Sequence, residues 1–190
     1  MVAGASGSGK SRLSRMAGNH VAQVSLDDFY HDHDHPDLPI RLGIPDWDHV
    51  STWDLQGAVQ ALAALVRNGF CELPVYDIST SRRTGTRELD VRDKKVVVAE
   101  GIFAPDAFRA ARQAGLPAEA IWLDRRRVAN FGRRLARDLK EHRKPPAILV
   151  RRGVALYRSE PAQRAAALEA GFAPMGMTDA LRLLRGLARL

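Results

Sequence analysis

The chain has 190 residues, enough for one globular domain, and we expect a single domain over residues 1–190. Its residues are 45% apolar and 27% charged, which excludes global disorder, and no run of about 18 apolar residues is present that could cross a membrane. One cysteine, Cys71, excludes an internal disulfide and a multi-cysteine zinc site. The first residues show no secretory signal pattern, so we expect a cytoplasmic protein.

The net charge of +7 comes from one stretch of the chain. Residues 125–152 hold 11 Lys or Arg and two acids, a net charge of +9, so the rest of the chain sums to −2. Such a segment attracts an anion, either nucleic acid or a small polyphosphate. Arg supplies 24 of the 29 basic residues, and its planar guanidinium suits two-pronged contacts with phosphate.

Short apolar runs alternate with helical patterns along the chain, which predicts the α/β class. Only three residues precede the first glycine, so either the first strand is very short or the start of the protein lies upstream. Asp54 is a good N-cap and Gly69 a good stop for the helix between them. The elements expected up to residue 90 are a helix over 10–17, a strand over 21–25, a loop over 31–50, that helix over 54–68 and a hairpin over about 70–90.

The second half of the chain continues the alternation. A four-residue apolar run over 96–99 is typical of a strand buried on both faces, and 121–123 is a further strand. The helices expected here span 126–141, 147–158 and 162–170, with a last one from Thr178. Together these elements predict a three-layer sandwich with a mostly parallel central sheet, helices on both faces and a helical, arginine-rich lid over about 125–152.

A glycine-rich motif follows the first strand. Residues 4–11 read Gly-Ala-Ser-Gly-Ser-Gly-Lys-Ser and fit G-x-x-x-x-G-K-[ST], the phosphate-binding loop of P-loop NTPases. Glycines let backbone N–H groups wrap around phosphates, and the following helix presents its positive end to the same anion. Lys10 would reach the β and γ phosphates, and the Ser11 hydroxyl would bind Mg²⁺. The residues predicted to bind ATP are Gly4, Ser6, Gly7, Ser8, Gly9, Lys10 and Ser11.

Acidic residues follow two of the predicted strands. Asp27 comes soon after the strand over 21–25, and Glu100 comes directly after the strand over 96–99. Because ligands of open parallel sheets bind beyond the carboxyl ends of the strands, both acids should face the phosphate loop. An acid in that place accepts a proton from an alcohol or binds magnesium. The alternative for Asp27 or Asp28 is that it caps a turn.

The motifs narrow the class of nucleotide-binding protein. A GTPase would need an Asn-Lys-x-Asp segment, and a transporter ATPase would need a Leu-Ser-Gly-Gly-Gln signature; neither is present. The chain length and the remaining motifs predict a small-molecule kinase.

Six segments, in order along the chain, resemble the uridine kinase family, within the wider phosphoribulokinase and uridine kinase group. They run over residues 4 to 138, and each is weak when taken alone. The resemblance implies transfer of the γ-phosphoryl group of ATP, with Mg²⁺, to a hydroxyl of a nucleoside-like acceptor. The segments are the phosphate loop at 4–11, Asp-Asp-Phe-Tyr at 27–30, Trp-Asp-His at 47–49, Pro-Val-Tyr-Asp at 74–77, Val-Ala-Glu-Gly-Ile at 98–102 and Arg-Arg-x-x-Arg-Asp at 133–138.

The resemblance implies roles for residues on the acceptor side. Asp27 would be the general base that takes the proton of the acceptor's 5′-hydroxyl. Tyr30 would shape the acceptor site, Asp48 would hold the ribose hydroxyls, and Tyr76 would stack on or line the base. Arg83, which lies in the predicted hairpin, either contacts an anionic acceptor or belongs to a solvated face.

The resemblance also implies roles on the ATP side. Ser11 would hold Mg²⁺ together with Asp27 and Glu100, directly or through water. Two arginines of the predicted lid lie where the family's lid arginines close on the sugar and the phosphates, and they would neutralise charge on the transferred phosphoryl group. The residues expected to act on that group are Asp27, Lys10, Arg134 and Arg137.

The departures from the family pattern lie on the acceptor and lid sides. Ser81 stands where a base-contacting His is expected, and His142 where a lid arginine is expected. The acceptor therefore stays open between a nucleoside and another sugar-like or vitamin-like alcohol. A nucleotide-regulated nucleic-acid-binding protein ranks below both, because the basic stretch coincides with the expected lid. The sequence also leaves open a homo-oligomer and a metal site in the His-Asp loop over 31–35.

Overall fold

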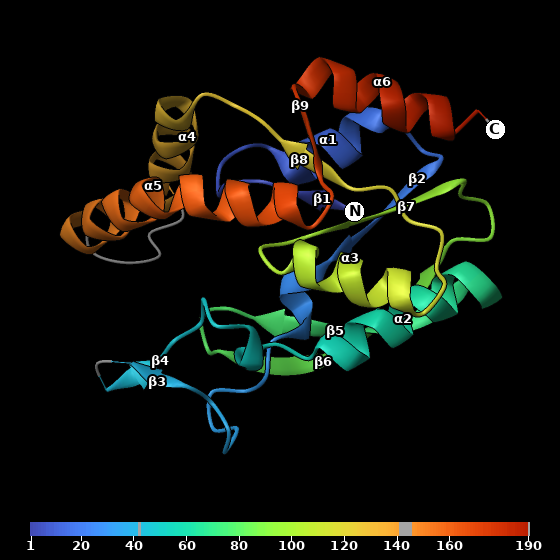
Figure 1. Cartoon of the computed structure of the whole chain (residues 1–190). Helices are drawn as coiled ribbons and strands as arrows, with labels where there is room; N and C mark the ends of the chain where they lie inside the picture. Colours follow the sequence, from blue (N-terminus) through green and yellow to red (C-terminus); the bar gives the residue numbers. More distant parts are fainter. Residues whose placement is uncertain (42, 141–145, 190) are drawn as a thin grey trace.

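A five-stranded parallel sheet forms the centre of the molecule, in the order β2-β7-β1-β8-β9 (Figure 1). The computed structural model describes residues 1–41, 43–140 and 146–189; the side chains of residues 134, 135, 137–140, 146–152 and 155 lie outside that description. Each neighbouring pair of strands is parallel, as the alternation of strands and helices predicted. The strands are β1 (Val2–Ala3), β2 (Val21–Ser25), β7 (Val96–Glu100), β8 (Ile121–Leu123) and β9 (Ala173–Met175).

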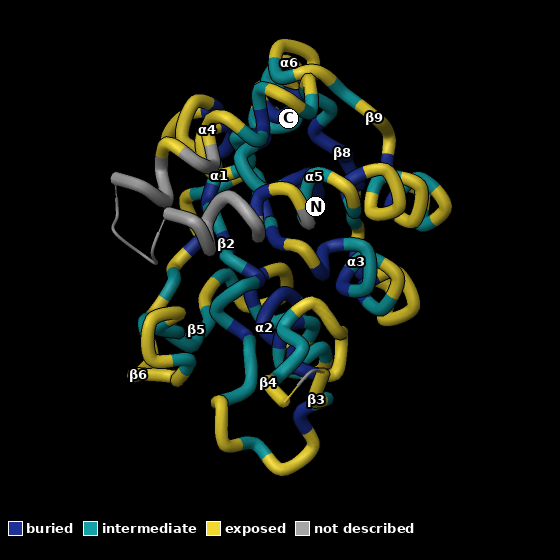
Figure 2. The backbone as a smooth tube through the Cα atoms, turned by 90° about the vertical axis from the view of Figure 1, so that its left-hand side faces the viewer, coloured by how far each residue is buried: buried dark blue, intermediate teal, exposed yellow. Residues whose placement is uncertain are grey.

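Helices cover both faces of this sheet and complete three layers (Figure 1). Successive side chains of a strand point to opposite faces, so each strand contributes side chains to two hydrophobic cores, one on each face of the sheet. Val2 packs in one core with α1 and α6, whereas Ala3 packs in the other with α2 and α3. Figure 2 shows the buried residues along the strands and on the inward sides of these helices. The bounds are α1 (Lys10–Ala17), α2 (Leu55–Asn68), α3 (Ala104–Gln113) and α6 (Met177–Leu187).

The remaining elements lie beside the sandwich. The predicted hairpin is formed by β5 (Phe70–Asp77) and β6 (Arg82–Asp90), which pair antiparallel. The segment predicted as a loop over 31–50 also contains a short antiparallel pair, β3 (Ile40–Arg41) and β4 (Ile44–Pro45). Two short 3-10 helices and a helical pair complete the chain: η1 (Leu26–Phe29), η2 (Val50–Thr52), α4 (Arg127–Lys140) and α5 (Pro146–Glu169).

Local chemistry fixes both ends of α2 as the sequence predicted. The Asp54 carboxylate accepts a hydrogen bond from the Gly57 N–H at 2.8 Å and so caps the first turn. Gly69 ends the helix with a φ of 77°, a left-handed conformation that glycine adopts without strain, and its N–H donates to the Leu65 carbonyl.

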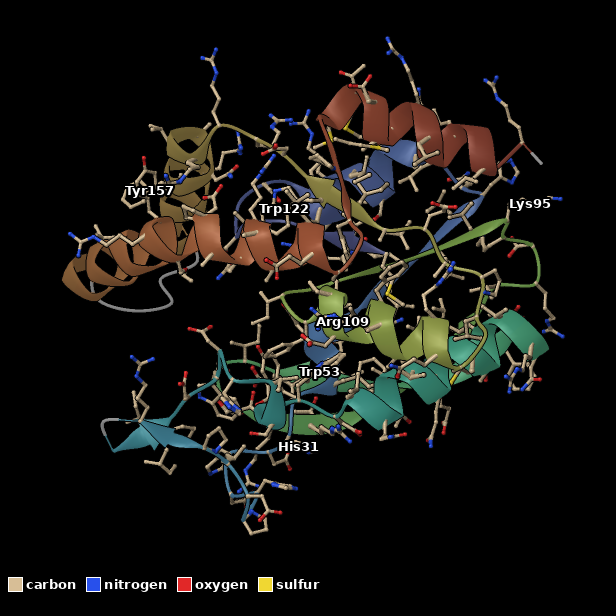
Figure 3. The ribbon with its side chains drawn as sticks, viewed as in Figure 1. His31, Trp53, Lys95, Arg109, Trp122 and Tyr157 are labelled. Carbon is tan, nitrogen blue, oxygen red and sulfur yellow. The ribbon has the colours of Figure 1, made fainter. Side chains whose placement is uncertain are left out.

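The C-terminal part differs from the prediction of two helices over 147–158 and 162–170. One helix, α5, continues through Pro161. Proline has no N–H to offer the carbonyl four residues earlier, which here belongs to Tyr157. The Arg127 guanidinium supplies the missing donor to that carbonyl and lies 4.1 Å from the centre of the Tyr157 ring. The side chain of Tyr157, a residue of α5, accordingly lies between α5 and α4 (Figure 3). A side chain from another helix thus satisfies the group that Pro161 leaves open.

Two elements of the sandwich were not predicted from the sequence. Helix α3 begins with a proline in its first turn, a position that tolerates the missing N–H. Strand β9 has three residues at the edge of the sheet, too few for a periodic pattern. Within the described ranges, none of the helices combines the length and the apolarity that a membrane span requires.

Leu13 and Met16 of α1 offer a matched test of the core. Leu13 is fully buried in the core shared by α1 and α6, whereas Met16 is 37% exposed. We expect Leu13→Ala to lower the free energy of unfolding by about 2–4 kcal/mol, because it removes buried atoms and leaves a cavity, and Met16→Ala by less than about 1 kcal/mol. Urea unfolding followed by circular dichroism measures both, and equal losses would contradict this packing.

Candidate active site

Three strands of the sheet end at the place where the predicted site residues gather. Strand β1 ends at Ala3 and continues into the glycine-rich loop, β2 ends at Ser25 and continues into η1, and β7 ends at Glu100. Parallel strands present their carboxyl ends at one edge of the sheet, which is where open α/β folds bind ligands. The fold therefore brings the phosphate loop, Asp27 and Glu100 together, as the sequence predicted.

The loop between β1 and α1 has the backbone shape of an anion cradle. Gly7 and Gly9 adopt φ angles of 84° and 97°, and the Ser8 N–H closes a turn onto the Ala5 carbonyl at 3.0 Å. A Cβ atom at Gly4 would lie 2.9 Å from the Ser8 hydroxyl oxygen and 3.2 Å from the Leu123 carbonyl oxygen, so only glycine fits there. Such a loop, leading into a helix N-terminus, can bind phosphate.

Side chains of the loop and of two strands meet in front of this cradle. The Lys10 ammonium donates to the Gly4 carbonyl at 2.9 Å. The Ser11 hydroxyl donates to the Glu100 carboxylate at 2.6 Å, and the Gln23 amide donates to the same carboxylate oxygen at 3.1 Å. Gln23 was not predicted, although a polar residue in the middle of the otherwise apolar run 21–24 was the available signal.

The Asp27 carboxyl group lies deep among these residues. Burial raises its pKa to about 6; the Lys10 ammonium opposes the shift, the Glu100 carboxylate adds to it, and a hydrogen bond from the Ile102 backbone opposes it. A Cβ atom at Gly101 would lie 3.0 Å from an Asp27 carboxylate oxygen, so the backbone passes this group too closely for any larger residue. Asp27 can therefore exchange a proton near neutral pH.

The neighbouring acid, Asp28, has a different environment. It faces the Arg87 guanidinium of the hairpin at 3.7 Å. Burial raises the pKa of Asp28, and Arg87 opposes that shift. Asp28 is thus already paired with a cation, whereas Asp27 faces the phosphate loop.

Aromatic residues form a wall next to Asp27. The Tyr30 and Tyr76 rings lie 5.7 Å apart between centres, and Phe103 lies 5.8 Å from Tyr30 on another side. The Tyr30 hydroxyl donates to the Trp47 carbonyl at 3.1 Å. Tyr30 and Tyr76 therefore lie side by side, whereas Asp48 is exposed.

Arg83 binds the backbone that carries Tyr30. Its guanidinium donates to the Tyr30 carbonyl at 3.1 Å, to the Phe29 carbonyl at 3.3 Å and to the Asp54 carboxylate at 3.2 Å. These acceptors are the last residue of η1, the residue after it and the cap of α2, so Arg83 joins the hairpin to η1 and to α2. Arg83 remains partly exposed, and its contact with an anionic acceptor stays a prediction.

The His-Asp loop over 31–35 is fastened to the turn of the hairpin. The Asp32 carboxylate accepts from the Arg83 N–H at 2.7 Å, Asp34 pairs with Arg82 at 2.7 Å, and the His33 N–H donates to the Ser81 carbonyl at 2.9 Å. Among the residues that the structure describes, no three His, Cys, Asp or Glu side chains gather as metal ligands. This loop therefore positions the hairpin turn.

One arginine of the predicted lid reaches the phosphate loop. The Arg133 guanidinium donates to the Gly7 carbonyl at 2.9 Å and to the Asn130 side chain at 2.8 Å. Burial lowers the pKa of Arg133, and the nearby cations Arg125 and Arg12 lower it further. The side chains of Arg134 and Arg137, which the sequence selected, lie outside the described residues, so their roles and the lid over 125–152 stay predictions.

Comparison with known proteins identifies the family. No family model matches the chain. A curated uridine kinase from Macrococcus caseolyticus (strain JCSC5402) is 30% identical over 145 residues, which cover 74% of this chain and 68% of that protein. The chain belongs to the uridine kinase family. A uridine kinase from Listeria monocytogenes serotype 4a (strain HCC23) is 29% identical over 146 residues, which cover 74% of this chain and 67% of that protein. This member of the uridine kinase family is therefore a kinase.

Solved structures confirm the fold. A protein from Silicibacter sp. TM1040, provisionally assigned as a fructose transport system kinase, has a TM-score of 0.63 and 23% identity and covers 92% of this chain and 87% of its own. A protein from Bacillus stearothermophilus, provisionally assigned as a uridine kinase, has a TM-score of 0.50 and 22% identity and covers 70% of this chain and 73% of its own. Both support the three-layer P-loop kinase fold.

The raised pKa of Asp27 predicts a pH dependence of stability. The pKa of its carboxyl group is about 6 in the folded protein, against an ordinary value of 3.8, so the folded state holds the proton more tightly. This group therefore lowers stability progressively as the pH rises from about 4 to 6, and by a constant amount above that range. In metal-free buffer we expect Asp27→Asn to be more stable than the wild type at pH 8, by up to about 3 kcal/mol.

Urea unfolding at several pH values measures this difference. The stability gap between Asp27→Asn and the wild type should close as the pH falls toward 4. Asp28→Asn is the control, since Asp28 pairs with Arg87 and its removal should leave that cation without its partner. A gap between the wild type and Asp27→Asn that does not change with pH would contradict the burial of the Asp27 carboxyl group.

Proposed function

We propose that this kinase transfers the γ-phosphoryl group of ATP to a hydroxyl of a nucleoside-like acceptor, in a reaction that requires Mg²⁺. The observation that carries the proposal is the meeting of Lys10, Ser11, Asp27 and Glu100 at the carboxyl ends of three parallel strands. A phosphate cradle with a cation, and a proton acceptor of pKa about 6 beside it, together suit phosphoryl transfer to an alcohol.

The phosphate loop binds the triphosphate in this proposal. Backbone N–H groups of residues 4–11 and the N-terminus of α1 attract the phosphate oxygens. Lys10, which contacts Gly4, exchanges that carbonyl for a phosphate oxygen. Arg133 makes a similar exchange at Gly7 and adds positive charge where negative charge builds up.

The donor set beside the loop fits magnesium. The Ser11 hydroxyl and the carboxylates of Glu100 and Asp27 are hard oxygen ligands, the type that Mg²⁺ prefers. When bound, the ion would neutralise charge on the phosphates. The hydrogen bond from Gln23 keeps the Glu100 carboxylate oriented toward Ser11.

Asp27 acts as the general base in the proposal. At neutral pH a carboxyl group with a pKa of about 6 is mostly ionised and still basic enough to accept a proton from an alcohol. The acceptor's hydroxyl gives its proton to an Asp27 carboxylate oxygen while the hydroxyl oxygen attacks the γ-phosphorus. The bond from the γ-phosphorus to the oxygen that bridges it to the β-phosphorus breaks, and ADP leaves with that oxygen. The Lys10 side chain, which lies near this carboxylate, faces the phosphates.

The acceptor lies against the aromatic wall in the proposal. Tyr30 and Tyr76 offer ring faces and edges of the kind on which a flat base or a sugar ring packs. Arg83 is a positioning residue, because its bonds to the Tyr30 and Phe29 carbonyls hold the chain that carries Tyr30. Asp48 is exposed and would approach the acceptor's hydroxyls as the loop around it packs on the ligand.

One position favours a second candidate acceptor. Ser81, where the family resemblance expects a base-contacting His, has a φ of 52° and ends its turn with a short hydroxyl side chain. A serine hydroxyl is shorter than an imidazole and cannot offer a base a charged hydrogen-bond donor. A sugar-like or vitamin-like alcohol is therefore the alternative acceptor.

An acceptor screen tests the proposal. The purified protein, with ATP and Mg²⁺, is offered uridine, cytidine, hexoses and vitamin alcohols, and ADP release is measured. We expect at least one nucleoside to raise ADP release 100-fold or more over the rate without acceptor. Turnover of a hexose or vitamin alcohol alone would select the second candidate, and no acceptor-dependent release would overturn kinase activity on this panel.

Replacing Asp27 tests the mechanism. We expect Asp27→Asn to lower kcat by about 10³-fold, because an amide cannot accept the proton, while ATP binding measured by calorimetry changes less than about threefold. Asp28→Asn is the matched control, since Asp28 pairs with Arg87 rather than facing the loop, and it should lose less than tenfold. Turnover by Asp27→Asn at the wild-type rate would remove Asp27 from the role of base.

A further inference from the structure

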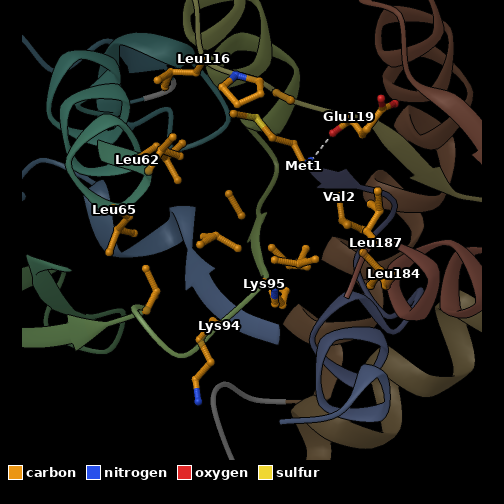
Figure 4. Close-up of a pocket in the computed structure, with 18 of the residues that line it drawn as sticks. Met1, Val2, Leu62, Leu65, Lys94, Lys95, Leu116, Glu119, Leu184 and Leu187 are labelled. Atoms are coloured by element: carbon orange, nitrogen blue, oxygen red, sulfur yellow. Dashed lines mark hydrogen bonds between the residues drawn. The ribbon is translucent and has the colours of Figure 1, made fainter. Parts of the chain in front are cut away.

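A cavity and a buried polar pair have no role in the proposed reaction. The cavity, of about 610 Å³, lies at the amino ends of β1, β7 and β8, with leucines of α2 and α6 on opposite sides of it (Figure 4). It is at the far end of these strands from the phosphate loop, and its walls are mainly apolar. The polar pair is Asn130 and Glu160, which lie between α4 and α5 and are 2% and 7% exposed. This pair, unlike the cavity, is connected to the phosphate loop.

Three hydrogen bonds in series connect Glu160 to the phosphate loop. The Asn130 amide donates to the Glu160 carboxylate at 3.1 Å, and its oxygen accepts from the Arg133 guanidinium at 2.8 Å. That guanidinium in turn donates to the Gly7 carbonyl at 2.9 Å. The series therefore runs from α5 through α4 to the loop between β1 and α1.

The chemistry of its two partners fixes the orientation of the Asn130 amide. A carboxylate only accepts hydrogen bonds, and a guanidinium only donates them. The NH₂ group of the amide must therefore face Glu160, which leaves the amide oxygen facing Arg133. Since the amide is bound at both ends, it cannot turn away from Arg133 without breaking a buried hydrogen bond, which is costly.

Glu160 lies on a turn of α5 that is packed against α4. The Arg127 guanidinium donates to the Tyr157 carbonyl and lies 4.1 Å from the centre of the Tyr157 ring, and the Phe131 ring meets that ring edge-on at 6.5 Å. Residues three and four apart lie on one face of a helix, so Arg127, Asn130 and Phe131 share the face of α4 that contacts this turn. The packing of the two helices therefore fixes the place of the Asn130 amide.

Arg133 benefits from such support because other cations lie near it. Besides burial, the charges of Arg125 and Arg12 lower the pKa of Arg133, which means that they oppose its positive charge. An arginine side chain also has many rotamers to choose from. An acceptor held in place by Glu160 opposes both effects and keeps the guanidinium at the phosphate loop.

We propose that Asn130 and Glu160 are positioning residues, which hold the Arg133 guanidinium at the phosphate loop so that it meets the triphosphate already oriented. When the triphosphate binds, Arg133 exchanges the Gly7 carbonyl for a phosphate oxygen and keeps its bond to Asn130. A charge that is placed in advance needs no rearrangement as negative charge builds up. This role rests on the proposed function, in which Arg133 contacts the triphosphate.

A double-mutant cycle on ATP binding tests this role. The affinity for ATP with Mg²⁺ is measured by calorimetry without an acceptor, so the result does not depend on which alcohol the enzyme uses. We expect Arg133→Ala and Asn130→Leu each to weaken binding about tenfold, because each removes an oriented cation. The double variant should bind ATP within about twofold of Arg133→Ala, because Asn130 acts only through Arg133. Wild-type affinity in Asn130→Leu, or losses that multiply to about a hundredfold, would overturn the proposal.

Variants of Glu160 give a second test, which also serves if Asn130→Leu does not fold. Glu160→Gln keeps an acceptor for the Asn130 amide and should bind ATP within about threefold of the wild type. Glu160→Ala removes the acceptor and should weaken binding about fivefold, but by less than about twofold in the Arg133→Ala background. Equal affinities of the Gln and Ala variants would overturn the positioning role of Glu160.

Phe131→Leu is the matched control on the same helix. It removes a ring that packs on Tyr157 and none of the three hydrogen bonds, so it should lower the melting temperature and leave the ATP affinity within about twofold of the wild type. A loss of affinity equal to that of Asn130→Leu would assign the effect to the packing of α4 and overturn the proposal. A wild-type protein that does not bind ATP would overturn the proposed function as well, whereas equal ATP binding by the wild type and Arg133→Ala would overturn the positioning role alone.

Discussion

The hydrogen bond between the Ser11 hydroxyl and the Glu100 carboxylate is the contact on which the geometry of the site depends. It joins the start of α1 to the end of β7 at 2.6 Å, and Gln23 of β2 donates to the same carboxylate oxygen. The three residues come from three segments that only the parallel sheet brings together. The packing that fixes the register of β2 on β7, with Ser25 opposite Glu100, therefore also fixes the distance between the phosphate loop and its acids.

The acceptor side is held by a different kind of interaction. Tyr30 of its aromatic wall lies on irregular backbone between η1 and α2, outside the central sheet. The Arg83 guanidinium replaces that support by binding two backbone carbonyls and the Asp54 carboxylate, which also caps α2. Charge-assisted hydrogen bonds of this kind are geometrically specific. The position of Tyr30 therefore depends on the hairpin that carries Arg83.

Local patterns predicted the parts of the structure that local physics determines. The helix over 10–17, the caps at Asp54 and Gly69 and the acids after two strands all follow from neighbouring residues. The continuation of α5 through Pro161 could not be predicted, because it depends on an Arg127 that lies more than 30 residues away. The hydrogen bonds of Arg83 could not be predicted for the same reason. The residues next to it in sequence show only a basic run, and its acceptors come close only when the hairpin folds.

The basic stretch illustrates how one charge pattern divides between two tasks. Arg127 uses its guanidinium on the Tyr157 carbonyl and ring, a structural contact that holds α4 against α5. Arg133, two turns along α4, donates to the Gly7 carbonyl of the phosphate loop. Because α4 is held at one end by Arg127, its next turns are placed over the phosphate loop. Part of the positive charge of residues 125–152 therefore holds the helix in place, and Arg133 brings another part of it to the phosphate loop.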